Sequence, residues 1–247
     1  MRLPLASAYG FLLLLVRTAA LCSTAPVLGS RVVPARVRLG IALGVSLAVF
    51  AGAGSPAVSP PSGLADLLAA SAGETAVGLL AGLGASWLLD AALSAGHAAG
   101  LAAGLGFSAV VDPFTGAQST AVSQAIFVVA QGCAVALGIH REAIAWLARA
   151  AVAFPPGAPV DLPSLAIHTV GLGAVSIALS VRLAFPVMAA VLLGHAVMGV
   201  MGRMAPQLSL GAIGFSVAIL AGGWALYLAA PAAAELAARA AVAAFRG

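Results

Sequence analysis

One segment decides how this sequence folds: Val111-Asp112-Pro113-Phe114-Thr115-Gly116-Ala117-Gln118, which lies between two long apolar runs. Pro113 lacks a backbone N–H and Gly116 permits a positive φ, so the segment predicts a break in helical structure. Asp112 can accept hydrogen bonds from nearby amides, as aspartates do in turns. Non-helical backbone at membrane depth is tolerated only inside protein or beside a water-filled cavity. The segment is therefore either a pore loop, with Phe114 available to fill the pore, or an ordinary turn in contact with water.

The composition predicts an integral membrane protein. Of the 247 residues, 62% are hydrophobic and only 7% are charged, whereas soluble domains carry about 25% charged residues. The chain leaves no room for a separate soluble domain, so residues 1–247 are expected to form a single membrane-embedded domain. The net charge of +4 gives no electrostatic support for binding nucleic acid.

The apolar runs predict the helices, because a membrane span takes about 20 residues. We expect spans or helices over the following ranges: 3–22, 39–54, 64–111 (long enough for two crossings), 120–139, 140–154 (short, amphipathic and interfacial), 162–201 (a hairpin that turns near Ser180–Pro186) and 208–230, followed by a short tail at 231–247. Three glycines at four-residue spacing, Gly96, Gly100 and Gly104, are expected on one face, where they would allow close helix packing. Arg31, Arg36 and Arg38 predict a cytoplasmic loop and an external N-terminus.

Charged residues inside the apolar runs are the candidate polar sites. An arginine at the bilayer centre costs about 2.5–3.5 kcal/mol on insertion scales and usually faces protein or water. Arg17 and Arg182 therefore suggest an ion path or a polar contact between subunits. The alternatives are that Arg17 reaches an interface and that Arg182 sits at a hairpin tip. Glu74 and Asp90 have no basic partner on their own helix and are expected to be structural or interfacial.

No catalytic or metal-binding pattern is present in the sequence. The four histidines are scattered without ligand spacing, and no nucleophile–base arrangement or phosphate loop occurs. The two cysteines, Cys22 and Cys133, lie in separate apolar runs and indicate neither a disulfide nor a metal site. We expect no enzymatic activity and no cofactor.

Several motifs, taken in order, resemble the FliR/SctT family of type III export-apparatus proteins. They are Arg17 with Pro26-Val27-Leu28-Gly29 and Val33-Pro34-Ala35-Arg36-Val37-Arg38, then Gly104-Leu105-Gly106-Phe107 leading into Asp112-Pro113 and Gly116, then Ser123-Gln124, Gly138-Ile139-His140 and Phe154-Pro155-Pro156-Gly157, and finally Gly202-Arg203-Met204-Ala205-Pro206-Gln207-Leu208 with Ile213-Gly214-Phe215. Ser209, Ser216 and His97 depart from the family's usual residues. The match covers nearly the whole chain, and its details favour the flagellar branch.

The resemblance implies an all-α membrane protein whose helical hairpins pack in a hetero-oligomeric export gate. FliP-type and FliQ-type subunits, together with an FlhB-type subunit, would be its partners in the bacterial inner membrane, within the flagellar basal body or secretion-system base. The gate would pass unfolded export substrates and contact membrane lipid. The non-helical central loop, about 106–118, would contribute Phe107 and Phe114 to a plug.

The resemblance also assigns roles to other residues. Asp112, Pro113 and Gly116 would shape the plug loop. The remaining candidates are expected to be intramembrane or subunit-contact polar residues: Arg17, Arg182, Arg203 and Gln207. A small-molecule secondary transporter is the alternative interpretation, because Arg182 near Pro186 resembles the broken helices of transporters. An intramembrane enzyme is a further alternative, but it lacks a nucleophile–base pair.

Overall fold

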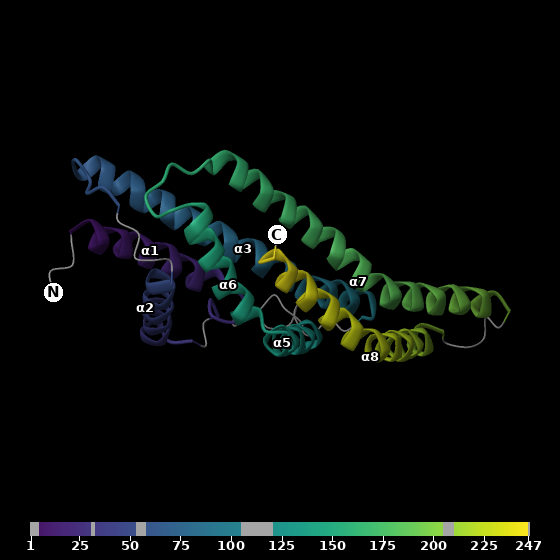
Figure 1. The fold of residues 1–247 in the computed structure, drawn as a ribbon. Coiled ribbons are helices and arrows are strands. Elements are labelled where there is room, and N and C mark those ends of the chain that lie inside the picture. Colours follow the sequence, from purple (N-terminus) through teal and green to yellow (C-terminus); the bar gives the residue numbers. More distant parts are fainter. Residues whose placement is uncertain (1–4, 31–32, 53–57, 105–120, 205–209, 247) are drawn as a thin grey trace. The chain divides into compact units, whose positions relative to one another are not determined.

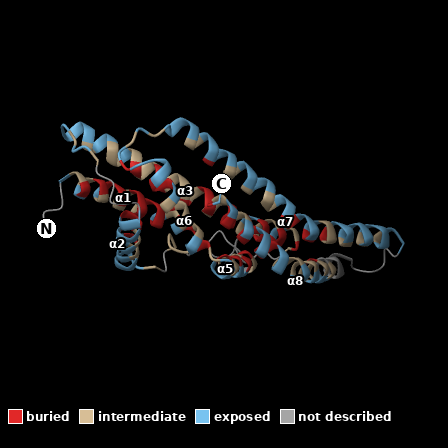
Figure 2. Cartoon of the chain, in the orientation of Figure 1, coloured by how far each residue is buried: buried red, intermediate tan, exposed pale blue. Residues whose placement is uncertain are grey.

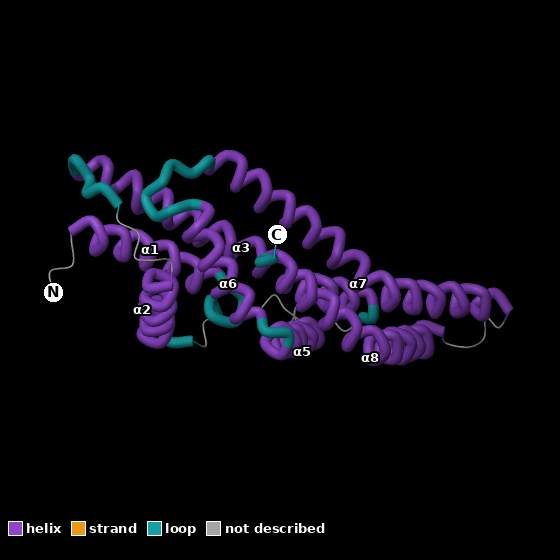
Figure 3. Tube along the Cα trace, in the orientation of Figure 1, coloured by secondary structure: helices purple, strands orange, loops and turns teal. Residues whose placement is uncertain are grey.

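The computed structural model describes residues 5–30, 33–52, 58–104, 121–204 and 210–246. These residues form helices joined by loops, with no strand among them (Figures 1 and 3). The predicted all-α class is therefore confirmed. The helices are α1 (Leu5–Thr24), α2 (Ala35–Gly52), α3 (Leu64–Ala102), α5 (Ala121–Ala136), α6 (Ile139–Ala153), α7 (Leu162–Met204) and α8 (Leu210–Ala244).

Five helices of the described residues are long and apolar enough to cross a membrane. They are α1, α2, α3, α7 and the part of α8 from Ile219 to Ala244. Helices α5 and α6 pass the same test only as a broken pair, which would bring the number of spans to six. The chain is an α-helical membrane protein, as its composition predicts.

Three long helices correct the predicted boundaries. Helix α3 is a single helix of 39 residues, where two crossings were expected over 64–111. Helix α7 runs unbroken for 43 residues with Pro186 inside it, so the predicted turn near Ser180–Pro186 is wrong. Helix α8 continues through Pro231, so the residues expected to form a separate tail are mostly helical. A proline removes only one N–H, and membrane helices tolerate it where neighbouring residues compensate for the lost bond.

The end of α3 corrects a second expectation. Gly104 lies beyond the last helical residue and has a φ of 74°. Its N–H bonds to the carbonyl of Leu101 at 3.0 Å. Gly96 does lie within the helix, but Gly104 cannot share a helical face with it, because a positive φ ends the helix as glycines commonly do.

The chain divides into two compact units. The first comprises Met1–Trp87, Val135–Gly173 and Ala240–Gly247, and the second comprises Leu88–Ala134 and Ala174–Arg239. Helices α3, α7 and α8 each contribute residues to both units. Each unit therefore combines segments that are far apart in the sequence.

The core of the first unit joins α1, α2 and α6. Buried apolar side chains from these helices cluster together: Leu14, Val49, Phe50, Leu147 and Ala151. The rings of Phe11 and Phe50 meet edge to face with centroids 5.5 Å apart. Figure 2 shows buried residues along α1, whereas much of α2 is exposed.

Two glycines let α3 approach α1 closely. A Cβ atom added at Gly78 would lie 2.8 Å from the Cβ of Ala20 and 2.9 Å from the backbone N of Leu21. One added at Gly82 would lie 2.9 Å from the backbone N of Ala25. The pair forms a GxxxG pattern, which allows membrane helices to bring their backbones together.

Glycines have the same role in the second unit. A Cβ atom at Gly96 of α3 would lie 2.8 Å from the Cα of Ser123 in α5. One at Gly222 of α8 would lie 2.6 Å from the Cβ of Ala103 and 3.0 Å from Val191 of α7. This close packing agrees with the expectation that Gly96 serves helix contact.

Candidate functional site

A buried ion pair joins two helices of the first unit. The Arg17 Nε of α1 donates to Glu74 Oε2 of α3 at 2.5 Å, and Arg17 Nη2 donates to Glu74 Oε1 at 3.1 Å. The side chain of Arg17 is 0% exposed and that of Glu74 is 2% exposed. The alternative in which the Arg17 side chain extends to the membrane surface is therefore wrong, because its guanidinium is buried and forms hydrogen bonds inside the chain.

The same two side chains bind the C-terminal end of α6. Arg17 Nη1 donates to the carbonyls of Ala150 at 3.2 Å and Phe154 at 3.1 Å, and Arg17 Nη2 donates to Phe154 at 3.0 Å. Glu74 Oε1 accepts the N–H of Gly157 at 2.8 Å. A cation is favourable at a helix C-terminus, where carbonyls lack helical partners. We call Arg17, Glu74 and these three backbone partners the polar node.

The polar node ties α1, α3 and α6 to the loop that precedes α7. Each charge is compensated by the other and by backbone groups, which is the condition under which buried ions are tolerated. This pairing could not be predicted from the sequence, because Arg17 and Glu74 are 57 positions apart. The available signal was that each is an isolated charge in an apolar run.

A second arginine organises the loop between α1 and α2. Arg38 Nε donates to the carbonyl of Leu28 at 3.0 Å, and its Nη2 donates to those of Ser30 at 3.0 Å and Val33 at 3.4 Å. Val27 in this loop has a φ of 70°, a region that β-branched residues rarely adopt. Arg38 thus stabilises the loop that was expected to be cytoplasmic.

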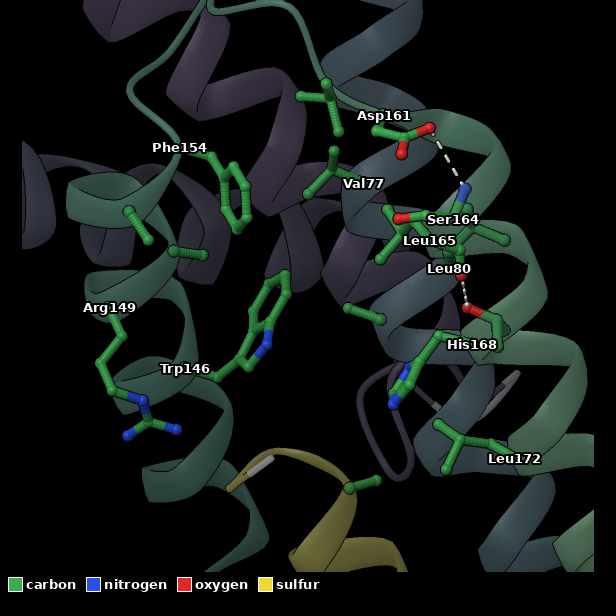
Figure 4. A pocket seen from close by; sticks show the side chains of 16 residues that line it. Val77, Leu80, Trp146, Arg149, Phe154, Asp161, Ser164, Leu165, His168 and Leu172 are labelled. Atoms are coloured by element: carbon green, nitrogen blue, oxygen red, sulfur yellow. Dashed lines mark hydrogen bonds between the residues drawn. The ribbon is translucent and has the colours of Figure 1, made fainter.

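A cavity of about 480 Å³ lies within the first unit (Figure 4). Its apolar wall includes Trp146 of α6, Phe154, and Leu165 and Leu172 of α7. Asp161 accepts the N–H of Ser164 at 3.3 Å, the dashed bond at the top of Figure 4, and so caps the start of α7.

Three polar side chains that line this cavity already form hydrogen bonds within the chain. Arg149 donates to the carbonyl of Phe245, Asp161 caps α7, and Thr169 donates to the carbonyl of Leu165 at 2.9 Å. Small-molecule sites usually present a few convergent polar groups to the ligand. The cavity therefore gives little support to the transporter alternative.

The remaining predicted site residues fall into two groups. Those of the plug loop (Phe107, Asp112, Pro113, Phe114 and Gly116) and Gln207 lie outside the described residues. Arg182 and Arg203 are described, and both are exposed on α7. Arg182 and Arg203 belong to the second unit, whereas the residues of the polar node belong to the first.

Comparison with known proteins gives a consistent result. Residues 8–243 match the family described as "Bacterial export proteins, family 1". The chain is 29% identical over 214 residues to the flagellar biosynthetic protein FliR of Caulobacter vibrioides, covering 85% of this chain and 84% of that protein. It is 28% identical over 208 residues to FliR of Escherichia coli, covering 84% and 79%.

A third relative supports the same assignment over a shorter region. FliR of Bacillus subtilis is 34% identical over 135 residues, covering 53% of this chain and 50% of that protein. Each of these three relatives is a flagellar protein, and the family match spans nearly all of the chain. The chain therefore belongs to bacterial export proteins, family 1, the FliR/SctT family, in its flagellar branch.

Proposed function

We propose that this chain is a non-enzymatic subunit of the flagellar type III export gate in the bacterial inner membrane. In this proposal it forms, with FliP-type and FliQ-type subunits and in contact with an FlhB-type subunit, the channel for unfolded export substrates. The single observation that carries the proposal is the family match over residues 8–243. Membership of that family already makes the chain a membrane component of the flagellar export apparatus.

The helices support a role in a packed assembly. Glycines bring α1 against α3 and α7 against α8 at distances that larger residues would prevent. Other faces remain uncovered: a Cβ atom added at Gly40 or Gly44 of α2 would meet no atom within 4 Å. Small residues on membrane helices favour contact with further helices.

The plug is part of the same proposal. Residues 106–118 would close the channel, with Phe107 and Phe114 as the occluding side chains and Asp112, Pro113 and Gly116 shaping the loop. The support is the sequence of this segment, in which a proline and a glycine disfavour a helix between two apolar runs.

Co-purification tests the assembly. The chain would be expressed with the FliP-type and FliQ-type subunits of the same bacterium and extracted in a mild detergent. We expect one discrete complex that contains all three proteins. A monomer or homodimer whose size is unaffected by the other subunits would contradict the gate and favour the transporter alternative.

Membrane conductance tests the plug. Deleting Pro113–Ala117 should leave the complex assembled and increase its ion leak, because the occluding loop becomes too short to close the channel. A deletion of equal length at Ser59–Gly63, in the exposed loop before α3, is the matched control and should leave conductance low. An assembled Pro113–Ala117 deletion complex with unchanged conductance would exclude the plug.

A further inference from the structure

Arg182 occupies an unusual position in the second unit. It lies near the middle of the 43-residue helix α7 and its side chain is exposed. At 1.5 Å per residue, it is about 30 Å from either end of the helix. The apolar side chains around it are also exposed: Val175 is 54% exposed, Val181 60% and Phe185 66%. A charge therefore stands in the middle of an uncovered apolar face.

The described residues do not compensate this charge. Their three ion pairs join Arg17 to Glu74, Arg239 to Glu235 and Arg246 to Glu142. In the described part of the second unit, Asp90 is the one carboxylate outside these pairs, and it makes no ion pair with Arg182. An arginine in an apolar membrane segment normally faces a partner or water.

A second polar group at the same place is the backbone carbonyl of residue 182, which Pro186 deprives of its helical donor. In an α-helix the carbonyl of residue 182 would accept the N–H of residue 186, and Pro186 has no N–H to give. Arg182 thus presents five N–H donors on its side chain beside a backbone acceptor that has lost its helical donor. Both groups need partners if this face is removed from water.

The flanking sequence argues against a lipid headgroup as the partner. The seven residues on each side of Arg182 contain no charged residue, tryptophan or tyrosine. Tryptophan, tyrosine and basic residues gather where a helix crosses the membrane interface. The surroundings of Arg182 are those of a membrane interior, where phosphate groups are out of reach.

We propose that the α7 face formed by Val175, Arg182, Phe185 and Pro186 docks a membrane helix of a neighbouring export-apparatus subunit, which supplies a carboxylate to the Arg182 guanidinium. A hydroxyl or amide donor one turn away on that helix would satisfy the carbonyl freed by Pro186. The inference rests on the proposed function, because it requires a partner subunit. It names the chemistry of that partner: an acidic side chain within an otherwise apolar helix.

Site-specific photo-crosslinking in the co-expressed complex tests the contact. A photoreactive phenylalanine analogue at position 185 leaves Arg182 in place and should form an adduct with a partner subunit. The same analogue at Val187, which is buried on α7, should crosslink only within the chain. Adducts to lipid alone at position 185, in an otherwise intact complex, would overturn the inference while leaving the proposed function standing.

Substitution tests the charge. Arg182→Gln should lower the amount of chain recovered with its partners by about tenfold, the effect of losing a charged hydrogen bond. Arg182→Lys should retain part of that recovery. Arg239→Gln is the control, because Arg239 is exposed in the same unit and is paired within α8, and its recovery should stay within about twofold.

Two results would overturn the charge contact. One is undiminished recovery of Arg182→Gln with the partners. The other is an equal reduction in the amount of the Arg182→Gln chain recovered when it is expressed without its partners, because the defect would then lie in the folding of the chain itself. A wild-type chain that forms no complex at all would instead contradict the proposed function, and this inference would fall with it.

Discussion

An arginine of the first unit and an arginine of the second lie in opposite environments. In the first unit, Arg17 is fully buried and bonded to Glu74 and to two backbone carbonyls of the α6 end. In the second unit, Arg182 is exposed on α7 and belongs to none of the ion pairs of the described residues. The first arrangement is complete within one chain, whereas the described residues supply no ion-pair partner to Arg182. The difference separates a charge that the chain compensates by itself from one that, in the proposed contact, a partner subunit compensates.

The largest expected effect comes from substitutions that break the polar node. Arg17→Leu or Glu74→Leu should each lower the free energy of unfolding by roughly 3–5 kcal/mol, because the remaining charge stays buried without its partner. The measurement is detergent-induced unfolding of the purified chain. The double substitution should cost less than the sum of the two single ones, since it leaves no buried charge.

Arg182→Leu is the matched comparison for the node. In the isolated chain it should change the free energy of unfolding by less than about 0.5 kcal/mol, as exposed substitutions usually do. If Arg182→Leu lowered the free energy of unfolding as much as Arg17→Leu, the proposed difference between the two arginines would be wrong.

The next effect concerns the contact between α1 and α3. Gly78→Ala should lower the free energy of unfolding by about 1–3 kcal/mol, because the new methyl group would press against Ala20 and the α1 backbone. Gly73→Ala in the same helix meets no atom within 4 Å and should stabilise the chain by about 0.5–1 kcal/mol. The same unfolding assay applies, and equal effects at both glycines would contradict the close approach.

The smallest effect is at the surface of the second unit. Arg239 and Glu235 are 65% and 50% exposed and pair within α8 at 2.6 Å. Arg239→Gln should cost no more than about 0.5 kcal/mol, and raising the salt concentration should remove even that difference. The effect of Glu74→Leu should persist at high salt, because buried charges are screened much less. A salt-sensitive node would show that water reaches it.

Sequence patterns predicted the helices well where apolar runs end at polar loops. Helices α1, α2 and α6 begin and end within a few residues of the expected bounds. The errors fall on α3, α7 and α8, where a long apolar run fits either one helix or a hairpin by composition alone. Pro186 and Pro231 suggested ends, but each removes only one backbone donor, and the helix continues through both.

The candidate site was harder to predict for a physical reason. Arg17 and Glu74 show no periodic relation, since their pairing depends on how α1 packs against Gly78 and Gly82 of α3. The sequence identifies each charge as costly in an apolar run, but it does not identify the residue with which that charge pairs. The plug remains a prediction, because residues 105–120 lie outside the described part of the chain.

The polar node also has a consequence for the order of synthesis. Arg17 enters the membrane with the first helix, but its acceptor at Phe154 follows 137 positions later. At bacterial elongation rates that interval lasts on the order of 10 s. Until Glu74 has been made, 57 positions after Arg17, the nascent chain carries a charge without its ion-pair partner, and until Phe154 has been made the guanidinium lacks one of its carbonyl acceptors. A product truncated or stalled before Glu74 would keep the charge uncompensated, which would make it distinguishable from a finished chain to the proteases that survey membranes.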